Sequence, residues 1–401
     1  MSNVNENTCT EQGRSIPDGW EETTLGEIAD TNPDSISRNY PYDEIFYLDT
    51  GSITKGEIES LQEYNLKEAP SRAKRLVQNK DIVYSTVRPN QEHYGFISEP
   101  KKNMVVSTGF TVIRAHSINE KLLYYYLTQP AVTSYLHTLA EHSTSAYPSI
   151  KPIDLENLSF SIPKNIKEQK AIANILTAFD DKIENLQAQN KTLEQTAQTI
   201  FAAWFGKYQV GDELPDGWRV GKLGDVIEIF DSQRIPLSKS QREEKKGEFR
   251  YYGATSIMDY VDEYLFDGIY LLLAEDGSVM DDEGYPFLQY VWGKFWVNNH
   301  AHILTGKYGF STEILYLFCK QMKVAGIVTG AVQLKINQKN LLGFELVIPP
   351  EQNLAELDKL IQSFFQKVRL NSDQIEYLKK TRDTLLPKLM SGQLRVNEFK
   401  A

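Results

Sequence analysis

The sequence Ile16-Pro17-Asp18-Gly19-Trp20 recurs 198 residues later as Leu214-Pro215-Asp216-Gly217-Trp218. At the same offset, Leu25-Gly26-Glu27-Ile28 recurs as Leu223-Gly224-Asp225-Val226. Proline followed by glycine predicts a tight turn, and the tryptophan after it predicts an anchor on a hydrophobic core. Because two neighbouring elements repeat in register, we predict that the chain contains one structural unit twice.

The two halves of the sequence also end alike. Each ends in a short apolar strand that closes with a proline, Phe160-Ser161-Ile162-Pro163 in the first half and Leu346-Val347-Ile348-Pro349 in the second. A Glu-Gln pair then opens a long helical segment, at Glu168-Gln169 and at Glu351-Gln352. The repeated unit is therefore predicted to be a globular domain followed by a long helix.

Both helical segments carry the heptad pattern of a coiled coil, with steps of three and four residues between seam positions. The first seam consists of Leu176, Phe179, Ile183, Leu186, Asn190, Leu193, Ala197, Ile200 and Trp204. The second consists of Ile361, Phe364, Val368, Asn371, Ile375, Leu378, Arg382, Leu385 and Leu389. The first helix is predicted to begin at Asn165, with Glu168 completing a capping box, and to stop at Gly206. An unbroken helix from Glu168 to Gly206 would be about 58 Å long, whereas Pro387 is predicted to bend the last turn of the second helix.

The polar seam positions favour an antiparallel pair of helices. In an antiparallel pair matched end to end, Asn190 and Asn371 fall in adjacent layers, where two amides can bond each other and penalise slipped registers. In a parallel pair Asn190 would face Ile375 and Asn371 would face Leu186, which leaves both amides poorly paired. The alternative is that both asparagines bond only to water at the edge of the seam.

Composition and charge describe a soluble protein of several domains with an uneven surface. The chain has 401 residues, 41% of them hydrophobic, and a net charge of -11, so a surface that wraps nucleic acid everywhere is excluded. Lys67–Lys102 nevertheless holds eight Lys or Arg against four acids, and Arg234–Arg250 holds six against three. Asp259–Gly284 holds nine acids and no base. Two basic islands in an acidic body are compatible with local contact to DNA.

The sequence shows neither a membrane span nor a disulfide framework. No run of roughly 18 apolar residues occurs, and residues 1–15 are expected to be a disordered polar tail without the features of a signal peptide. Cys9 and Cys319 are the only cysteines, too few for a disulfide framework or a thiolate zinc site. We therefore expect a cytoplasmic protein.

The order of these features resembles the specificity subunits of Type I restriction-modification systems. The resemblance runs from about Ile16 to Gly392, and its most specific segments are 16–28, 214–226, 162–183, and 268–279 with Asn298-Asn299-His300-Ala301-His302. It implies an α+β fold with a pseudo-twofold internal repeat, in which two mixed α/β target-recognition domains are separated by two long helices forming an antiparallel coiled coil. The expected boundaries are target-recognition domain 1 at 16–164, spacer helix 1 at 165–207, target-recognition domain 2 at 208–350, spacer helix 2 at 351–392 and a C-terminal tail at 393–401.

The resemblance also implies partners and a division of labour. Each recognition domain would read one half of a bipartite double-stranded DNA target, and the helices would set the spacer between the halves. Two methyltransferase subunits and restriction or translocase subunits would assemble around the chain. S-adenosylmethionine, ATP and magnesium are expected in those subunits, and no cofactor is expected in this chain. Helices of this length suit two readers held at least one DNA turn apart, roughly 34 to 36 Å.

Motifs for catalysis are missing from the sequence. Asn32-Pro33-Asp34 begins like the catalytic tetrapeptide of a methyltransferase but continues into Ser35, and no Gly-x4-Gly-Lys-Ser/Thr phosphate loop occurs. Asp231, Glu243 and Lys245 have nuclease-like spacing, but 238–247 is almost wholly polar rather than a buried strand.

The acidic run 281–283 is interpreted as a solvated loop, and His300 with His302 as packed or hydrogen-bonded residues, since no third metal ligand is identifiable. A non-catalytic subunit is predicted; the alternatives are a coiled-coil scaffold that binds only proteins and a stand-alone magnesium-dependent nuclease.

Candidate DNA-reading residues are polar and basic side chains on loops, because Arg and Lys suit guanine edges or phosphates and Asn and Gln suit adenine. In the first domain they are Arg72, Lys74 and Arg75, then Arg88, Asn90, Gln91, His93 and Tyr94 after the apolar segment Asp81–Val87, with the loop from Ser143 to Tyr147 as a further candidate. In the second they are Gln233, Arg234, Ser238, Lys239, Arg242, Arg250, Tyr252 and Lys335. The same segments also fit solvated helix faces or a hairpin tip, and both interpretations stay open at this point.

Overall fold

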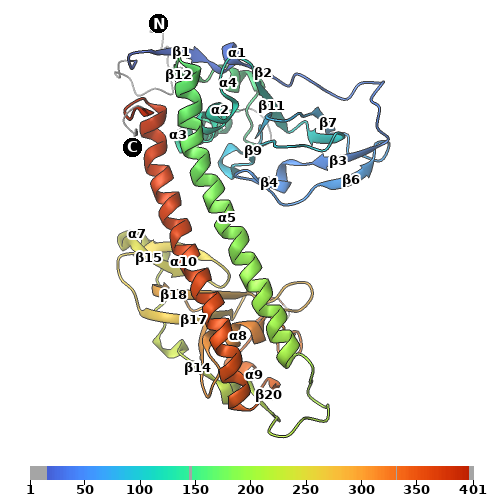
Figure 1. The fold of residues 1–401 in the computed structure, drawn as a ribbon, viewed down its shortest axis with the longest axis vertical. Coiled ribbons are helices and arrows are strands. Elements are labelled where there is room, and N and C mark those ends of the chain that lie inside the picture. Colours follow the sequence, from blue (N-terminus) through green and yellow to red (C-terminus); the bar gives the residue numbers. More distant parts are fainter. Residues whose placement is uncertain (1–15, 144–146, 331, 397–401) are drawn as a thin grey trace. The chain divides into compact units, whose positions relative to one another are not determined.

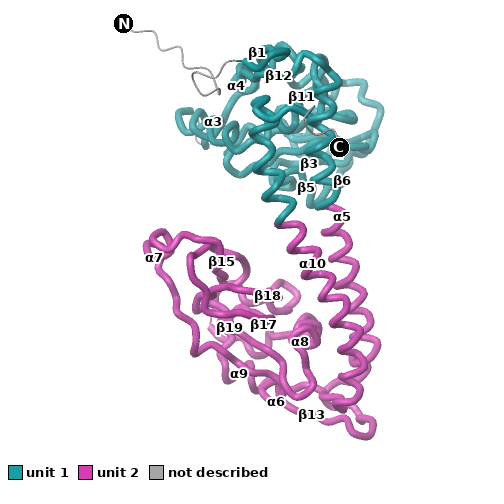
Figure 2. Tube along the Cα trace, turned by 60° about the vertical axis from the view of Figure 1, so that its left-hand side comes forward, with its two compact units in different colours: residues 1–183, 377–401 teal, residues 184–376 magenta. Residues whose placement is uncertain are grey.

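The computed structural model of the chain describes residues 16–143, 147–330 and 332–396 (Figure 1). These residues form two compact units (Figure 2): one contains residues up to Ile183 together with Tyr377 onward, and the other is Glu184–Glu376. The tail predicted at 1–15, which contains Cys9, lies outside the described residues, as does 397–401. Within the described residues, every helix is too short or too polar to cross a bilayer.

The first unit contains two four-stranded sheets with a core between them. One sheet has the strand order β6 (Gln62–Asn65), β3 (Glu44–Leu48), β10 (Met104–Ser107), β7 (Ala73–Leu76). The other has the order β2 (Ala29–Thr31), β11 (Phe110–Ala115), β8 (Ile82–Ser85), β9 (Tyr94–Phe96). Leu48 and Val106 from the first sheet pack against Val83 and Val112 from the second. A short hairpin joins β4 (Ile53–Thr54) to β5 (Glu57–Ile58).

Helices cover the other face of the second sheet. Ile82 and Ile113 from that sheet share a core with Leu122 of α2 (Glu120–Leu127) and Leu136 of α3 (Pro130–Glu141). Asn119 caps α2, because its side chain accepts a hydrogen bond from the Leu122 amide at 3.0 Å. The short helices α1 (Leu25–Ile28) and α4 (Pro152–Glu156) complete this unit.

The opening and closing motifs of each repeat pair with each other. In the first unit β1 (Trp20–Thr24) is antiparallel to β12 (Ser159–Pro163), with Trp20 opposite Pro163. In the second unit β13 (Arg219–Lys222) is antiparallel to β20 (Glu345–Ile348) in the same way. Gly19 and Gly217 both have positive φ angles, 77° and 81°, which explains why the turn before each strand uses glycine.

The tryptophans of the two turns are anchored differently. Trp20 is buried and donates from Nε1 to the Glu168 carboxylate at 3.3 Å, and Arg395 pairs with the same carboxylate at 2.8 Å. Glu168 therefore joins the opening turn to the first long helix instead of closing the predicted capping box; Asn165 accepts a hydrogen bond from the Lys167 amide at 2.9 Å. Trp218 instead lies against Phe205 and Tyr208.

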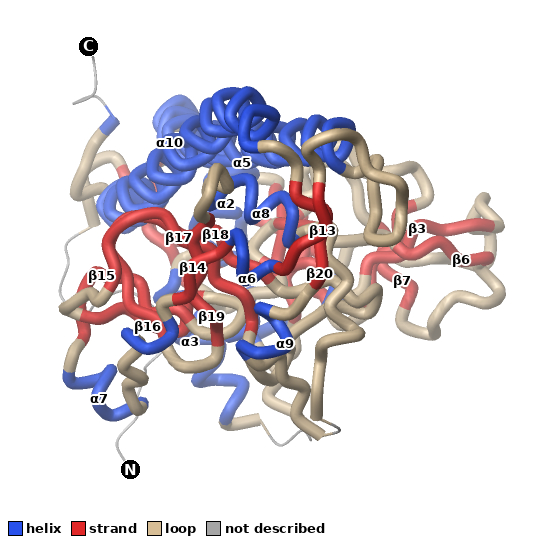
Figure 3. The backbone as a smooth tube through the Cα atoms, turned by 90° about the horizontal axis from the view of Figure 1, so that it is seen from below, coloured by secondary structure: helices blue, strands red, loops and turns tan. Residues whose placement is uncertain are grey.

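The second unit is built on a six-stranded sheet, which Figure 3 shows in red. Its strand order is β14 (Ile227–Ile229), β19 (Ala301–Gly306), β17 (Phe266–Ala274), β18 (Leu288–Val297), β15 (Lys246–Tyr252), β16 (Ile257–Val261). Leu271 and Leu273 share a core with α8 (Thr312–Cys319), whereas Leu272 packs on the opposite face, as the two-residue period of a strand requires. The remaining helices are α6 (Leu223–Val226), α7 (Lys239–Glu244) and α9 (Gln338–Leu342).

The two long helices are α5 (Ile166–Phe205) and α10 (Glu351–Met390), and each contributes to both units. In the first unit Leu176 of α5 shares a core with Leu386 and Leu389 of α10. In the second unit Phe201 of α5 shares a core with Ile361 of α10. The start of one helix thus packs with the end of the other in each unit, which confirms the antiparallel direction. α10 continues through Pro387 to Met390.

Half of the predicted seam positions are buried, and all but one of the others are partly covered. Leu176, Ile183, Leu186 and Ala197 of α5 are buried, as are Ile361, Val368, Asn371, Ile375 and Leu389 of α10. Phe365 is fully buried while the predicted Phe364 is only partly covered, and Trp204 is 41% exposed. The heptad pattern therefore found the seam, but not which of two adjacent phenylalanines is the more deeply packed.

Candidate nucleic-acid interface

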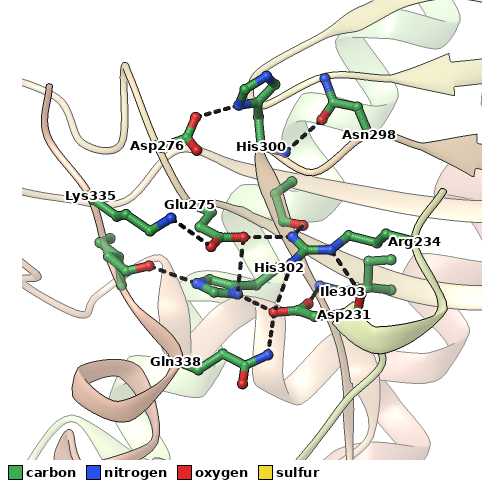
Figure 4. Close-up of polar contacts among 12 residues, drawn as sticks. Asp231, Arg234, Glu275, Asp276, Asn298, His300, His302, Ile303, Lys335 and Gln338 are labelled. Atoms are coloured by element: carbon green, nitrogen blue, oxygen red, sulfur yellow. Dashed lines mark hydrogen bonds and ion pairs between the residues drawn. The ribbon is translucent and has the colours of Figure 1, made fainter. Parts of the chain in front are cut away.

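The second unit contains a polar cluster around the buried His302, drawn in Figure 4. We name Asp231, Arg234, Glu275, His302, Lys335 and Gln338 the His302 cluster. His302 lies on β19 and is fully buried. Its Nδ1 is 2.6 Å from Oδ2 of Asp231, and its Nε2 is 2.8 Å from the Ile336 carbonyl oxygen. Both ring nitrogens of His302 therefore have an oxygen partner from another segment of the unit.

Fixed donors surround the two carboxylates of the cluster. Arg234 donates to Glu275 at 2.6 Å and lies 3.5 Å from Asp231, so one guanidinium bridges both. Lys335 pairs with Glu275 at 3.2 Å, and Gln338 donates to Asp231 at 2.7 Å. Burial by itself raises the pKa of both carboxyls, but His302 beside Asp231 and Arg234 beside Glu275 outweigh it and hold both pKa values below their ordinary range.

The cluster also has the residue types of a metal site. Asp231, Glu275 and His302 each offer one ligand atom, all within 4.8 Å of one another. No third ligand for the histidines is recognisable in the sequence, because both carboxylates come from other segments: Asp231 from the 3-10 helix η3 (Asp231–Gln233) and Glu275 from the residue after β17. A divalent cation does not fit, because it would lie beside the Arg234 guanidinium that already bridges the carboxylates. The cluster is an internal ion network that holds four segments together.

The residues singled out as nuclease-like are not part of one centre. Asp231 belongs to the His302 cluster, whereas Glu243 lies on α7 beside Lys239 and Lys245 pairs with Glu263 at 2.7 Å. His300 pairs with Asp276 at the edge of the cluster (Figure 4), so the two histidines have separate carboxylate partners. Asp281 accepts hydrogen bonds from the Glu283 and Tyr285 amides, which makes the acidic run a hydrogen-bonded turn.

The basic island of the second unit is neutralised within the unit. All six of its cations form ion pairs: Arg234 with Asp231 and Glu275, Lys239 with Glu243, Arg242 with Asp259, Lys245 with Asp262 and Glu263, Lys246 with Asp259, and Arg250 with Glu376. The acids between Asp259 and Gly284, which looked like a separate acidic surface, supply several of these partners. The charge count of the sequence thus overstated the positive field of this segment.

Burial separates the candidate residues of the second unit into two groups. Tyr252 is buried against Phe295, and the side chains of Arg234, Arg242 and Arg250 are less than one fifth exposed. These four side chains are committed to contacts inside the unit rather than presented outward. Gln233, Ser238, Lys239 and Lys335 are exposed, and Ser238 caps α7 by accepting from the Gln241 amide.

The loop between β8 and β9 carries the exposed candidates of the first unit. Arg88, Asn90 and Gln91 are exposed, whereas Tyr94 is buried against Tyr84 and His93 bonds the Ile53 carbonyl oxygen at 2.6 Å. Because β8 and β9 are antiparallel neighbours, the loop is the tip of a hairpin. Arg88 and Glu92 on either side of the 3-10 turn η2 (Pro89–Gln91) have positive φ angles, 47° and 56°. Such strained positions cluster at binding and catalytic sites.

Two segments that are far apart in the sequence meet at this hairpin tip. The Arg88 amide donates to the Pro148 carbonyl oxygen at 2.9 Å, and the Arg88 guanidinium lies 5.3 Å from the centre of the Tyr147 ring. Val87 also forms a bridge with Ser149. The candidate loop from Ser143 to Tyr147 therefore adjoins the candidate loop at Arg88; residues 144–146 lie outside the described residues.

Unlike the basic island of the second unit, the basic patch of the first unit is not neutralised by ion pairs. Arg72 and Lys74 are exposed, and Arg75 is half-buried on β7, at the edge of its sheet. Within the part of the chain that the structure describes, the side chains of these three residues take part in no ion pair. Burial lowers the pKa of Arg75. These cations are free to meet an outside anion.

Comparisons with known proteins agree with this architecture. The family model described as the Type I restriction modification DNA specificity domain matches this chain twice, over residues 17–195 and 215–382. The chain therefore belongs to the family of Type I restriction-modification DNA specificity subunits, which confirms the resemblance found in the repeats.

Relatives match most of the chain. The MjaIX specificity subunit of Methanocaldococcus jannaschii is 28% identical, over 76% of this chain and 76% of its own. The HindI specificity subunit of Haemophilus influenzae is 24% identical, over 94% of this chain and 99% of its own. The crystal structure of a Type I restriction-modification S subunit from M. genitalium has a TM-score of 0.56 at 17% identity, covering 96% of this chain and 98% of that one, so it is similar in fold.

Proposed function

We propose that each recognition domain reads one half of a bipartite DNA target, and that the paired helices set the spacer between the halves. The observation that carries this proposal is the duplication: the specificity domain occurs twice in one chain, and each copy is followed by one of two antiparallel helices of 40 residues. A helix of that length rises about 60 Å, which supports a role in separating two readers. The hydrogen bond between Asn371 and Asn190 supports one fixed register of the pair.

For the first domain we propose that the reading surface is the hairpin tip with Arg88, Asn90 and Gln91. These three side chains are exposed, and the amide and guanidinium groups that they carry suit adenine and guanine edges. Arg72 and Lys74 would bind phosphates, since they have no carboxylate partner among the described residues. For the second domain we propose Gln233, Lys239 and Lys335, the exposed members of its candidate set other than Ser238, whose side chain caps α7.

We further propose that the chain has no catalytic centre and works in the cytoplasm within a larger complex. Two methyltransferase subunits would dock on it together with restriction or translocase subunits, and these partners would bind S-adenosylmethionine, ATP and magnesium. The internal use of Asp231, Glu275 and His302 by Arg234, Lys335 and Gln338 supports this division, because the group with the spacing of a metal site is already occupied by donors of the chain itself.

Methylome sequencing of cells that express the chain with its methyltransferase subunit tests the proposal. We expect a bipartite methylated motif that disappears when the chain is omitted. Combined Arg88→Ala, Asn90→Ala and Gln91→Ala substitutions should change one half of the motif and leave the other half and the spacer unchanged. Arg38→Ala with Asn39→Ala, an exposed pair in the same domain, is the matched control. Methylation that is independent of the chain would refute the proposal.

A further inference from the structure

A buried triad joins the second recognition domain to α10. Glu313 on α8 has a side chain that is only 3% exposed, and its Oε1 accepts hydrogen bonds from the Tyr290 hydroxyl at 2.6 Å and from Arg369 at 2.7 Å. Tyr290 lies on β18, and Arg369 lies on α10. Gln362, two turns before Arg369 on the same face of α10, donates to Oε2 of Glu313 at 2.7 Å. The buried charge of Glu313 is therefore satisfied from the long helix.

A triad of the same chemistry occurs in the first unit. Asp180 on α5 accepts from the Tyr125 hydroxyl of α2 at 2.6 Å and from Arg382 of α10 at 2.6 Å. In the repeat, Arg382 corresponds to Ala197 and Asp180 corresponds to Phe365. This triad is therefore not a copy made by the duplication, and it also differs in position and burial. Asp180 lies on α5, so its ion pair with Arg382 joins the two long helices, and the Asp180 side chain is 34% exposed. Only the Tyr125 hydroxyl connects it to the recognition domain.

The physical effect of such a triad differs from that of the apolar contacts around it. Apolar side chains can repack with small losses, so a hydrophobic contact alone allows a domain to rock on a helix. Hydrogen bonds are directional, and a buried carboxylate that loses its partner is strongly penalised. A triad therefore favours one angle between the recognition domain and the helix against neighbouring angles.

We propose that Arg369 is a positioning residue, which fixes the angle of the second recognition domain on α10 and so narrows the range of DNA spacer lengths that the protein accepts. This inference rests on the proposed function, since it assigns to one residue a share of the selectivity for spacing. Arg369 itself need not touch DNA.

The test uses the chain assembled with its methyltransferase subunit and a set of DNA duplexes. All duplexes carry the same two half-sites, and their spacers differ from the native length by one or two base pairs. The Arg369→Met, Glu313→Gln variant removes the ion pair without leaving a buried charge. We expect it to methylate the native site, while its preference for the native spacer over its neighbours falls by about tenfold, or about 1.4 kcal/mol.

The matched control is Arg242→Met with Asp259→Asn, an ion pair of similar burial that lies within the second domain away from α10. It should keep the native spacer preference. If the Arg369 variant is folded by circular dichroism and keeps the preference as well, the inference is overturned. If the double variant fails to fold, the spacer preference of Tyr290→Phe, which lacks one hydroxyl of the triad, is measured instead. An unchanged spacer preference of Tyr290→Phe counts equally against the inference. A wild-type complex that ignores the half-sites at every spacing would instead refute the proposed function.

Discussion

Asn371 on α10 donates a hydrogen bond to Oδ1 of Asn190 on α5 at 2.9 Å, within a largely apolar seam. Asn190 in turn donates to the Ser372 hydroxyl at 3.0 Å and to the Val368 carbonyl oxygen at 3.3 Å. A buried amide costs stability unless its partner lies opposite, and a slipped register would remove that partner. The pair therefore selects one register of the antiparallel helices, and the alternative that both amides bond only to water is not what the structure shows.

Replacing one asparagine should cost stability, whereas replacing both should not, because the pair serves to fix the register of the helices. Asn190→Ala leaves the buried Asn371 amide without its acceptor and should lower the free energy of unfolding by about 1–3 kcal/mol. Asn190→Leu with Asn371→Leu should be close to neutral or stabilising, because apolar groups replace both partners and the variant no longer buries the Asn371 Oδ1, which has no hydrogen-bond partner among the described residues. Urea denaturation measures both effects. A double leucine variant that is less stable than Asn190→Ala would contradict the role assigned to the pair.

Acid should weaken the second domain through the His302 cluster. The folded-state pKa values of Asp231 and Glu275 lie below those of the unfolded chain, which are about 3.9 for Asp and 4.3 for Glu. Their contribution to stability is therefore full above about pH 4.3 and is lost as the pH falls through the lower folded-state values. In denaturation curves measured across this range, the stability difference between wild type and Asp231→Asn should shrink on acidification. If the stability difference grew as the pH fell, the pKa values of the two carboxyls would be raised in the folded state and not lowered.

Divalent cations should not stabilise the protein through the His302 cluster. Because Arg234 and Lys335 already compensate the two carboxylates, zinc or manganese would meet fixed positive charge there. A cation bound to the folded state at a hundred times its dissociation constant would add about 2.7 kcal/mol, which a thermal denaturation curve resolves. We expect the same melting temperature with added zinc, added manganese or a chelator. If zinc or manganese raised the melting temperature of the wild type but not that of Asp231→Asn, the cluster would be a metal site.

The two basic islands should differ in the salt dependence of DNA binding. Arg72→Ala with Lys74→Ala removes two unpaired cations and should reduce the slope of log affinity against log salt by about two. Lys245→Ala with Lys246→Ala also removes two cations, but both are paired with acids of the second domain, so the slope should change little. Filter binding of the assembled complex over a range of salt gives both slopes. Equal reductions would mean that the ion pairs of the second domain open on binding.

Several features were predictable because they are periodic or local. The repeated turn, the closing Ile-Pro strand and the steps of three and four along the helices are all visible within short windows, and the two asparagines occupy seam positions that an antiparallel pair places in adjacent layers. The exposed hairpin tip at Arg88 followed from an apolar strand and a polar loop. The pairing of the opening strand with the closing strand was not visible, since Trp20 and Pro163 meet only after the whole domain has folded between them.

The sequence by itself determined the duplication, the antiparallel helix pair and the family, because heptad spacing and repeated turns act on neighbouring residues. Only the tertiary structure decided which charges are free. Arg234 was a candidate DNA ligand in the sequence, but in the structure it pairs with Glu275, 41 residues away. His302 had no recognisable partner in the sequence, but in the structure it contacts Asp231, 71 residues away. Ion pairs act through space at a few ångströms, so their partners follow from strand order and not from position along the chain.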